Sequence, residues 1–239
     1  MSKAHPRTSA YWLAGLHAVS AVLANPERVV RRLVAIPEVG RTLPRAAENI
    51  AKTELAKLVP PGTVHQGVAA LVELLEQPDV ADIARQAADL ERAVVVVLDQ
   101  VTDPHNVGAI LRSAAAFGAL AVVVPDRNAP EENATVAKSA SGALEKVPLV
   151  RATNLVRALE DLKDAGFWVA GLDGRAPVTL NEAKLSGKIV LVLGSEGEGM
   201  RRLTRERCDH LVRLPISGAV ESLNVSNAAA VALYELARQ

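Results

Sequence analysis

Six short and almost uninterrupted apolar segments constrain the fold of this chain more than any other feature of its sequence. β-Branched residues dominate them, which is typical of strands buried on both faces of a parallel sheet. The residues between these segments have helical periodicity, and most of these helical stretches end at a glycine. The pattern predicts an open α/β sheet. The six segments are 93–98, 119–124, 146–151, 167–172, 188–193 and 210–215.

A smaller α/β module is expected upstream of this sheet. Between the two, residues 73–92 contain Gln77, Pro78 and a mixed charged and alanine-rich run, as in a linker with a short helix. We therefore expect a small domain over residues 1–72, a linker over 73–92 and a larger domain over 93–239. The expected elements of the small domain are helices at 12–23 and 46–58 and strands at 29–36 and 63–72.

The composition limits the class of protein. The chain has 239 residues, of which 49% are hydrophobic and 23% are charged, so it should bury a core and not remain disordered. No run of 18 apolar residues predicts a membrane span, and the first ten residues lack the apolar region of a secretory signal. Cys208 is the single cysteine, which excludes an intramolecular disulfide and fits a reducing compartment. We expect a cytoplasmic protein.

Charge is unevenly distributed although the net charge is zero. Residues 1–67 hold nine Lys or Arg against four Asp or Glu, which hints at an anionic partner, while ordinary surface charge explains the excess about equally well. Aromatic residues are few there, so base stacking is poorly supported. The candidate phosphate contacts are Arg28, Arg31, Arg32, Arg41, Arg45, Lys52 and Lys57.

Polar or glycine-rich loops follow four of the apolar segments, after residues 98, 172, 193 and 215. Ligands of open α/β sheets bind outside the carboxyl ends of the strands, so these loops are expected to form one site. The loop GSEGEG at 194–199 lacks the lysine of a Walker loop, and its position does not fit a dinucleotide fingerprint. Three glycines and two carboxylates suit a ligand without phosphate.

Other kinds of chemistry find little support. The five histidines are scattered and no His or Cys pair has zinc-ligand spacing, so no metal is expected. No G-x-S-x-G elbow is present. Arg205 and Arg207 could lower the pKa of Cys208, yet a lone cysteine beside a strand is more often inert.

Three motifs carry a more specific signal. NVGAILRSA at 106–114, LVLGSEGEGM at 191–200 and LPISGAVESLNVSNAAA at 214–230 resemble, in order and spacing, the three motifs of the SpoU (TrmH-type) RNA ribose 2′-O-methyltransferases. The resemblance covers residues 93–239. The N-terminal module, with HQG at 65–67, resembles the RNA-binding domain of the RlmB-like branch, the bacterial 23S rRNA guanosine 2′-O-methyltransferases.

This resemblance implies a SPOUT-type α/β fold, an open and mainly parallel sheet with a C-terminal trefoil knot, beside a small N-terminal α/β RNA-binding domain. It also implies a homodimer that uses S-adenosyl-L-methionine to methylate a ribose in 23S rRNA, on a guanosine of the peptidyl-transferase region. The substrate would be free rRNA or an assembling large ribosomal subunit. Two alternatives stay open: a tRNA or resistance-type rRNA methyltransferase of the same family, and a non-catalytic RNA-binding or ribosome assembly protein.

The matched motifs also suggest site residues. Arg112 stays protonated in proteins, so we interpret it as a clamp on substrate phosphate that also stabilises the developing alkoxide. Its apolar neighbours predict a largely buried helix in which Arg112 needs an anionic partner. The catalytic candidates are Arg112, Asn106, Glu196, Ser222 and Asn224. The cofactor-binding candidates are Leu172, Asp173, Gly174, Gly194, Glu196, Gly197, Leu214, Ile216, Ser222 and Leu223.

The segment from 222 to 236 has two further interpretations. Ser222 and Asn224 precede an apolar helix and are of the types favoured as N-caps. The apolar face of residues 225–236 is expected to be buried partly against a second subunit.

Overall fold

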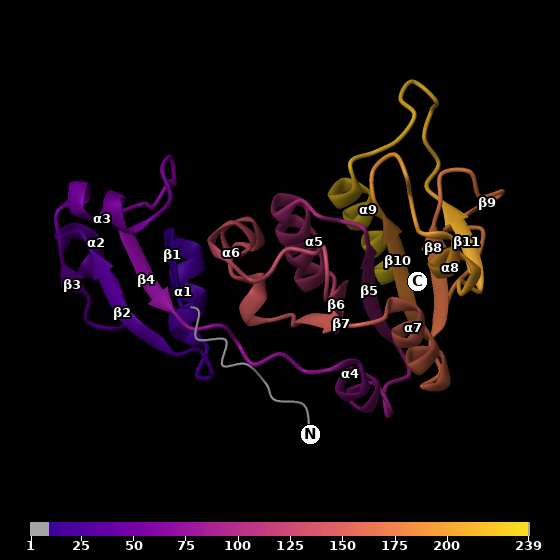
Figure 1. Cartoon of the computed structure of the whole chain (residues 1–239), viewed down its shortest axis with the longest axis horizontal. Helices are drawn as coiled ribbons and strands as arrows, with labels where there is room; N and C mark the ends of the chain where they lie inside the picture. Colours follow the sequence, from indigo (N-terminus) through magenta and orange to yellow (C-terminus); the bar gives the residue numbers. More distant parts are fainter. Residues whose placement is uncertain (1–9, 239) are drawn as a thin grey trace.

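The computed structural model describes residues 10–238, which form two sheets at opposite ends of an elongated molecule (Figure 1). The smaller sheet has the order β1-β4-β2-β3, with β4 antiparallel to both of its neighbours. Its strands are β1 (Tyr11–Ala14), β2 (Val30–Ala35), β3 (Glu48–Asn49) and β4 (Val68–Val72). The helices beside it are α1 (Leu16–Ala24), α2 (Pro37–Gly40) and α3 (Lys52–Leu58).

The small sheet departs from the sequence prediction at three places. The predicted helix at 12–23 begins with a strand, because Gly15 adopts φ 103° and separates β1 from α1. The predicted helix at 46–58 holds the short strand β3 before α3. The predicted strand at 63–72 begins only at Val68, because positive φ at Gln66 and Gly67 makes a turn there.

The larger sheet has seven strands in the order β7-β6-β5-β10-β8-β11-β9, and each neighbouring pair is parallel. The predicted open and mainly parallel α/β sheet is therefore confirmed. Its strands are β5 (Ala93–Asp99), β6 (Ala121–Pro125), β7 (Leu149–Ala152), β8 (Trp168–Leu172), β9 (Val178–Thr179), β10 (Lys188–Gly194) and β11 (His210–Arg213). The remaining elements are α4 (Val80–Gln86), α5 (Pro104–Ala116), α6 (Ala134–Ala140), the 3-10 turn η1 (Ala143–Glu145), α7 (Leu155–Asp164), α8 (Arg202–Glu206) and α9 (Val225–Arg238).

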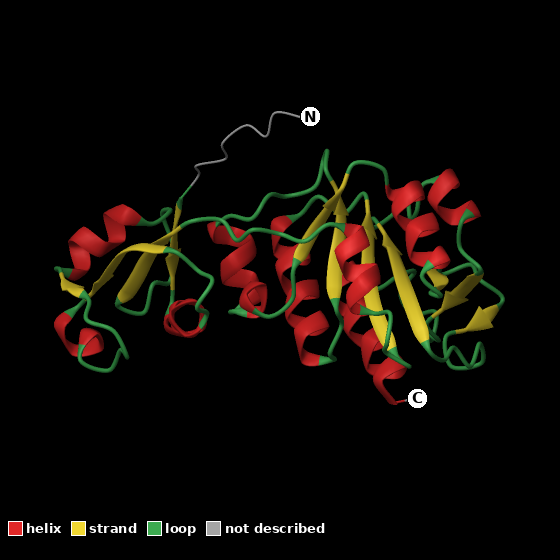
Figure 2. Ribbon diagram, turned by 90° about the horizontal axis from the view of Figure 1, so that it is seen from below, coloured by secondary structure: helices red, strands yellow, loops and turns green. Residues whose placement is uncertain are grey.

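Helices flank the larger sheet on both sides (Figure 2). α5 contacts α6 and α9 on one side, and α7 contacts α4 and α8 on the other. Each face of the sheet accordingly has its own buried cluster of apolar side chains. Among residues 10–238, no helix is long and apolar enough to cross a membrane. His5, one of the scattered histidines, lies outside the described residues.

Helix α9 uses its apolar face inside the chain. Val225, Ala229 and Leu233 belong to the core and the helix packs on α5 and β10, so much of this face is buried within the chain itself. Val231 and Tyr234 of the same helix remain 47% and 51% exposed.

The two sheets share one apolar core. Val19 and Val22 of α1 belong to the same buried cluster as Val136 of α6 and Leu144 of η1. A Cβ at Gly142 would lie 2.6 Å from the Cβ of Ala21, so the backbone after α6 approaches α1 closely. The N-terminal module is thus packed against α6 and η1. Figure 1 shows α6 beside β1 and α1.

Candidate active site

Glu196 connects two motifs that are far apart in the sequence. Its Oε1 accepts hydrogen bonds from Asn224 Nδ2 at 2.6 Å and from the Val225 backbone N–H at 3.2 Å, with Asn106 Nδ2 at 3.5 Å. Asn224 Nδ2 also donates to Asn106 Oδ1 at 3.0 Å. We call these three side chains, Asn106, Glu196 and Asn224, the amide–carboxylate cluster. The structure brings together one predicted site residue from each motif.

The start of α9 explains why Asn224 is held so firmly. Its Oδ1 accepts from the Ser226 N–H at 3.0 Å and from the Ser226 hydroxyl at 2.6 Å, which is N-cap geometry. The Glu196 carboxylate satisfies the neighbouring N–H of Val225, and a negative charge is favourable at a helix N-terminus. Helix α9 therefore orients both members of this pair.

The glycine-rich loop that carries Glu196 is anchored at both ends. Ser195 and Gly199 exchange two backbone hydrogen bonds, and a Cβ at Gly194 would lie 2.1 Å from the carbonyl carbon of Gly199. Fully buried Asp99 accepts from the Arg201 backbone N–H at 2.8 Å and from Arg201 Nε at 2.7 Å. Sequence reasoning did not single out Asp99 or Arg201. An aspartate at the end of an apolar strand is nevertheless a usable signal, because a buried carboxylate must have a partner.

The loop after β8 is fixed in a similar way. Asp173 donates its N–H to the Val212 carbonyl at 2.8 Å, and its carboxylate accepts from the Arg175 N–H at 2.8 Å and from Arg205 Nε at 3.0 Å. Partial burial opposes ionisation of Asp173, but these hydrogen bonds outweigh it and hold the pKa of Asp173 below its usual value. No other atom would lie within 4 Å of a Cβ at Gly174, so this backbone is open to a ligand.

The connection from β11 to α9 is exposed to solvent over most of its length. Residues 215–222 are exposed throughout, and the segment stands out from the edge of the larger sheet (Figure 1). Ile216 is exposed at its base, whereas Leu214 packs against the core and Leu223 is partly buried. Within the described chain Ser222 makes no hydrogen bond, so it is not the N-cap of α9 that its position suggested.

Arg112 lies on the exposed side of α5, so the apolar neighbours that predicted a largely buried helix do not bury its side chain. Ile110, Leu111 and Ala114 are the buried residues around it, and the guanidinium points away from that apolar side. No carboxylate of the described residues pairs with it. Its positive charge is therefore available to an external anion.

A cleft of about 540 Å³ opens beside the glycine-rich loop, at the carboxyl ends of β5, β6 and β10. Its lining residues are Gln100, Thr102, Pro125, Arg127, Asn128, Ser195, Glu198 and Arg201. Amide, hydroxyl and guanidinium groups predominate, as suits a polar organic ligand. In the described part of the chain, no three His, Cys, Asp or Glu side chains gather as a metal site would require.

Cys208 lies outside this group. Burial, followed by the nearby Asp209 carboxylate, raises the pKa of its thiol to about 12. The two neighbouring arginines do not activate it, and the interpretation of an inert cysteine agrees with this environment.

The model of the SpoU rRNA Methylase family matches residues 93–234, which is more than half of the chain. The chain belongs to the SpoU rRNA methylase family. The match begins with β5 and reaches into α9, so it contains all three members of the amide–carboxylate cluster.

Individual members of the SpoU family are similar over almost the whole chain. The 23S rRNA (guanosine-2'-O-)-methyltransferase RlmB of Photorhabdus laumondii subsp. laumondii is 44% identical, with 94% of this chain and 96% of that protein covered. RlmB of Escherichia coli (strain K12) is 43% identical, with 94% and 97% covered. The SpoU methyltransferase AviRb from Streptomyces viridochromogenes, solved in complex with AdoMet, matches with a TM-score of 0.79 at 26% identity, covering 96% of this chain and 90% of that one.

Proposed function

We propose that this protein transfers a methyl group from S-adenosyl-L-methionine to the ribose 2′-hydroxyl of a guanosine in 23S rRNA. The observation that carries the proposal is the amide–carboxylate cluster, whose Asn106 lies on the same helix as Arg112, an arginine that pairs with no carboxylate of the described residues, in a chain of more than 40% identity to RlmB proteins. Because these side chains are in place, the non-catalytic alternative is disfavoured. The substrate is free 23S rRNA or an assembling large subunit in the cytoplasm.

The loops at the carboxyl ends of β8, β10 and β11 fit this cofactor. In the sheet, Leu193 of β10 lies beside Leu172 of β8, and Leu172 lies beside Val212 of β11. The three loops therefore leave the sheet side by side. Open backbone at Gly174 and Gly197 allows close approach, and Glu196 and Asp173 bring negative charge to a ligand that carries a cationic sulfonium. When bound, the cofactor supplies an activated methyl group. The residues that would hold it are Leu172, Asp173, Gly174, Gly194, Glu196, Gly197, Leu214, Ile216, Ser222 and Leu223.

The remaining residues act on the RNA. Methyl transfer requires the 2′-oxygen to be aligned with the methyl group, so catalysis consists mainly of positioning and of stabilising the developing alkoxide. Arg112 would bind a substrate phosphate and stabilise that negative charge. Asn106, fixed by Glu196 and Asn224, would orient the ribose beside it. Ser222, on the exposed loop, would join the site when the loop closes over the cofactor.

Three finer features complete the proposal. Residues 1–72 would form the substrate-binding domain, 73–92 the linker and 93–239 the catalytic domain. The chain returns from β11, near the sheet edge, to α9 over the middle of the sheet, and Glu196 binds it where it passes the glycine-rich loop, which supports a trefoil knot at this crossing. Exposed Val231 and Tyr234 support a homodimer, which a concentration-dependent mass measurement would test.

The structure divides the predicted phosphate contacts of the N-terminal domain into side chains that are already paired and side chains that are not. Arg28 is buried in ion pairs, and Arg31 and Arg32 pair with Glu73 and Glu48, so these arginines are poor phosphate ligands. Four of the predicted contacts remain exposed and without a carboxylate partner in the described chain: Arg41, Arg45, Lys52 and Lys57. We assign phosphate binding to these four.

The decisive experiment measures transfer of a labelled methyl group to 23S rRNA transcribed in vitro, which carries no modification. Arg112→Ala should lower the rate by about 10²–10³-fold, as for loss of one charge-stabilising donor, while cofactor binding is retained. Arg157→Ala, at an exposed arginine of α7 whose side chain has no partner among residues 10–238, is the matched control and should match the wild type. Cofactor binding without transfer to rRNA, or full activity of Arg112→Ala, would refute the proposal.

A further inference from the structure

Buried ion pairs hold the N-terminal domain in one orientation on the larger sheet. Arg28 donates from Nη1 to Glu132 Oε1 and from Nη2 to Glu145 Oε1, both at 2.6 Å. Tyr11 adds a hydrogen bond from its hydroxyl to Glu132 Oε1 at 2.8 Å. The side chains of Arg28, Glu132 and Glu145 are 0%, 8% and 4% exposed. We call Tyr11, Arg28, Glu132 and Glu145 the interdomain latch.

The electrostatic environment of the latch favours its charged form. Burial acts to lower the pKa of Arg28, but the hydrogen bonds to Glu145 and the charge of Glu132 outweigh it and raise that pKa. Burial together with Glu132 raises the pKa of Tyr11, so its hydroxyl stays protonated and donates. The charged latch therefore joins the two domains on one side of a space between them.

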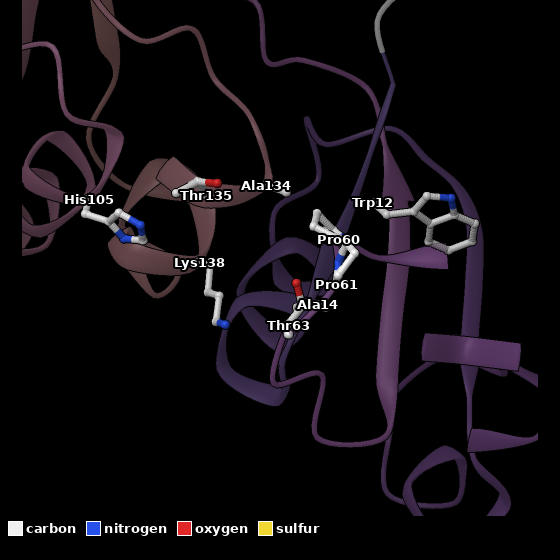
Figure 3. A pocket seen from close by; sticks show the side chains of 10 residues that line it. Trp12, Ala14, Pro60, Pro61, Thr63, His105, Ala134, Thr135 and Lys138 are labelled. Atoms are coloured by element: carbon white, nitrogen blue, oxygen red, sulfur yellow. The ribbon is translucent and has the colours of Figure 1, made fainter. Parts of the chain in front are cut away.

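Such a space exists beside the latch. A cavity of about 200 Å³ lies between the loop at 60–63 and the helices α5 and α6 (Figure 3). Figure 3 shows Lys138 extending from α6 toward Thr63, and the Trp12 indole pointing away from the space between the domains. The lining residues are Trp12, Ala14, Pro60, Pro61, Gly62, Thr63, His105, Ala134, Thr135 and Lys138. We call this space the interdomain cavity.

The lining divides into an apolar wall and a cationic wall. Pro60 and Pro61 offer flat apolar surface from the N-terminal domain. Opposite them, Lys138 is the one fully charged side chain among the described lining residues, and no carboxylate of residues 10–238 pairs with it. His105 lines the same cavity, and its Nδ1 lies 3.2 Å from Ser139 Oγ. An unpaired cation next to hydroxyl and imidazole groups selects for an anion such as phosphate.

Helix α5 contributes one residue to the cavity and the next to the proposed methyl-transfer site. His105 lines the cavity, while the next residue, Asn106, belongs to the amide–carboxylate cluster. Consecutive helical residues point in different directions, so the first turn of α5 has one side chain toward each site. An RNA strand whose ribose lies at Asn106 thus has its neighbouring backbone near the entrance of the cavity.

The size of the cavity limits the ligand. Pockets that enclose a whole drug-sized molecule have about 300–1,000 Å³, so this cavity admits a sugar–phosphate unit and not a complete nucleotide. We propose that the interdomain cavity binds the RNA sugar–phosphate backbone next to the methylated nucleotide, with the phosphate at Lys138 and His105 and the ribose against Pro60 and Pro61. The inference rests on the proposed function and assigns a second RNA contact to it.

The salt dependence of RNA binding tests this assignment. Binding of unmodified 23S rRNA transcript is measured over a series of salt concentrations. Lys138→Gln should reduce the slope of log K against log salt by about 0.7–0.9, the loss of one phosphate contact, and Lys138→Arg should restore it. Thr63→Glu places a negative charge opposite Lys138 and should weaken binding further. The matched control is Lys146→Gln, at an exposed lysine outside the cavity, which should keep the wild-type slope.

The outcomes separate this inference from the proposed function. If wild-type protein transfers methyl groups to the transcript but Lys138→Gln keeps the full slope, the cavity is not an RNA site and the inference fails alone. If wild-type protein transfers no methyl group to any transcript, the proposed function fails first. Equal losses in Lys138→Gln and Lys146→Gln would also overturn the inference, because they indicate a diffuse effect of net charge.

Discussion

Replacement of Arg28 by methionine should uncouple the two domains. Methionine keeps much of the volume but removes the charge, so Glu132 and Glu145 are left buried without a cation. Breaking a buried pair by removing one partner costs about 3–5 kcal/mol, mainly as the desolvation of the charge that remains. The guanidinium also donates to the Glu73 carbonyl at 2.7 Å, which places the expected loss toward the upper end of that range.

Urea unfolding with domain-specific fluorescence can measure this loss. The chain has two tryptophans, Trp12 in β1 of the small sheet and Trp168 in β8 of the larger one. In a Trp168→Phe background, Trp12 alone reports on the N-terminal domain. For a loss of about 4 kcal/mol and an m-value of about 2 kcal/mol/M, Arg28→Met should lower the urea midpoint of this signal by about 2 M.

Two companion variants decide whether the buried charge is the cause. The triple variant Arg28→Met/Glu132→Gln/Glu145→Gln removes the unpaired charges and should recover most of the loss. Arg32→Met breaks an exposed pair with Glu48, whose side chains are 44% and 50% exposed, and should change the midpoint little. The reasoning is refuted if Arg28→Met and Arg32→Met behave alike, or if the triple variant is no more stable than the single one.

Further predictions concern the site and the cysteine that lies outside it. Glu196→Gln keeps an acceptor but removes the charge that fixes Asn224, so single-turnover methyl transfer should fall by about 10²-fold; an unchanged rate would contradict the role of the cluster. Gly194→Ala places a Cβ against the Gly199 carbonyl and should weaken cofactor binding measured by calorimetry by at least about tenfold, since the loop must move. Cys208 should react slowly with a thiol reagent at pH 8 in the native state and quickly in urea, because burial raises its pKa to about 12. As pH rises above about 8.5 the unfolded thiol ionises first, so the free energy of unfolding should decrease between there and about pH 12; Cys208→Ala should abolish this part of the pH dependence.

The sequence predicted the larger sheet well because its strands are buried on both faces. Runs such as AVVVVL contain no polar residue, so β5 can be recognised as a buried strand from its own residues alone. The small sheet was harder. The apolar residues of Tyr11–Ala14 merge with those of α1 in sequence, and only the positive φ of Gly15 divides strand from helix.

The site illustrates a different limit of sequence reasoning. Motif matching selected Asn106, Glu196 and Asn224, which the structure joins, but the apolar neighbours of Arg112 did not reveal that its side chain is exposed. Arg28 was assigned to RNA because its charge is visible in the sequence, while its partner Glu145 is 117 residues away. Ion pairs across domains cannot be derived from local pattern, since nothing near either residue specifies the other.

The amide–carboxylate cluster also has a consequence for the order of biosynthesis. Asn224 and Asn106 are 118 residues apart, so Asn106 emerges from the ribosome long before its partner is made. The N-terminal domain and much of the larger sheet have the chain they need to fold by then, because domains fold as they are synthesised. Glu196, however, lacks two of its three donors until α9 has been translated and has reached its place. A nascent chain therefore gains activity only after the segment holding Asn224 has left the exit tunnel.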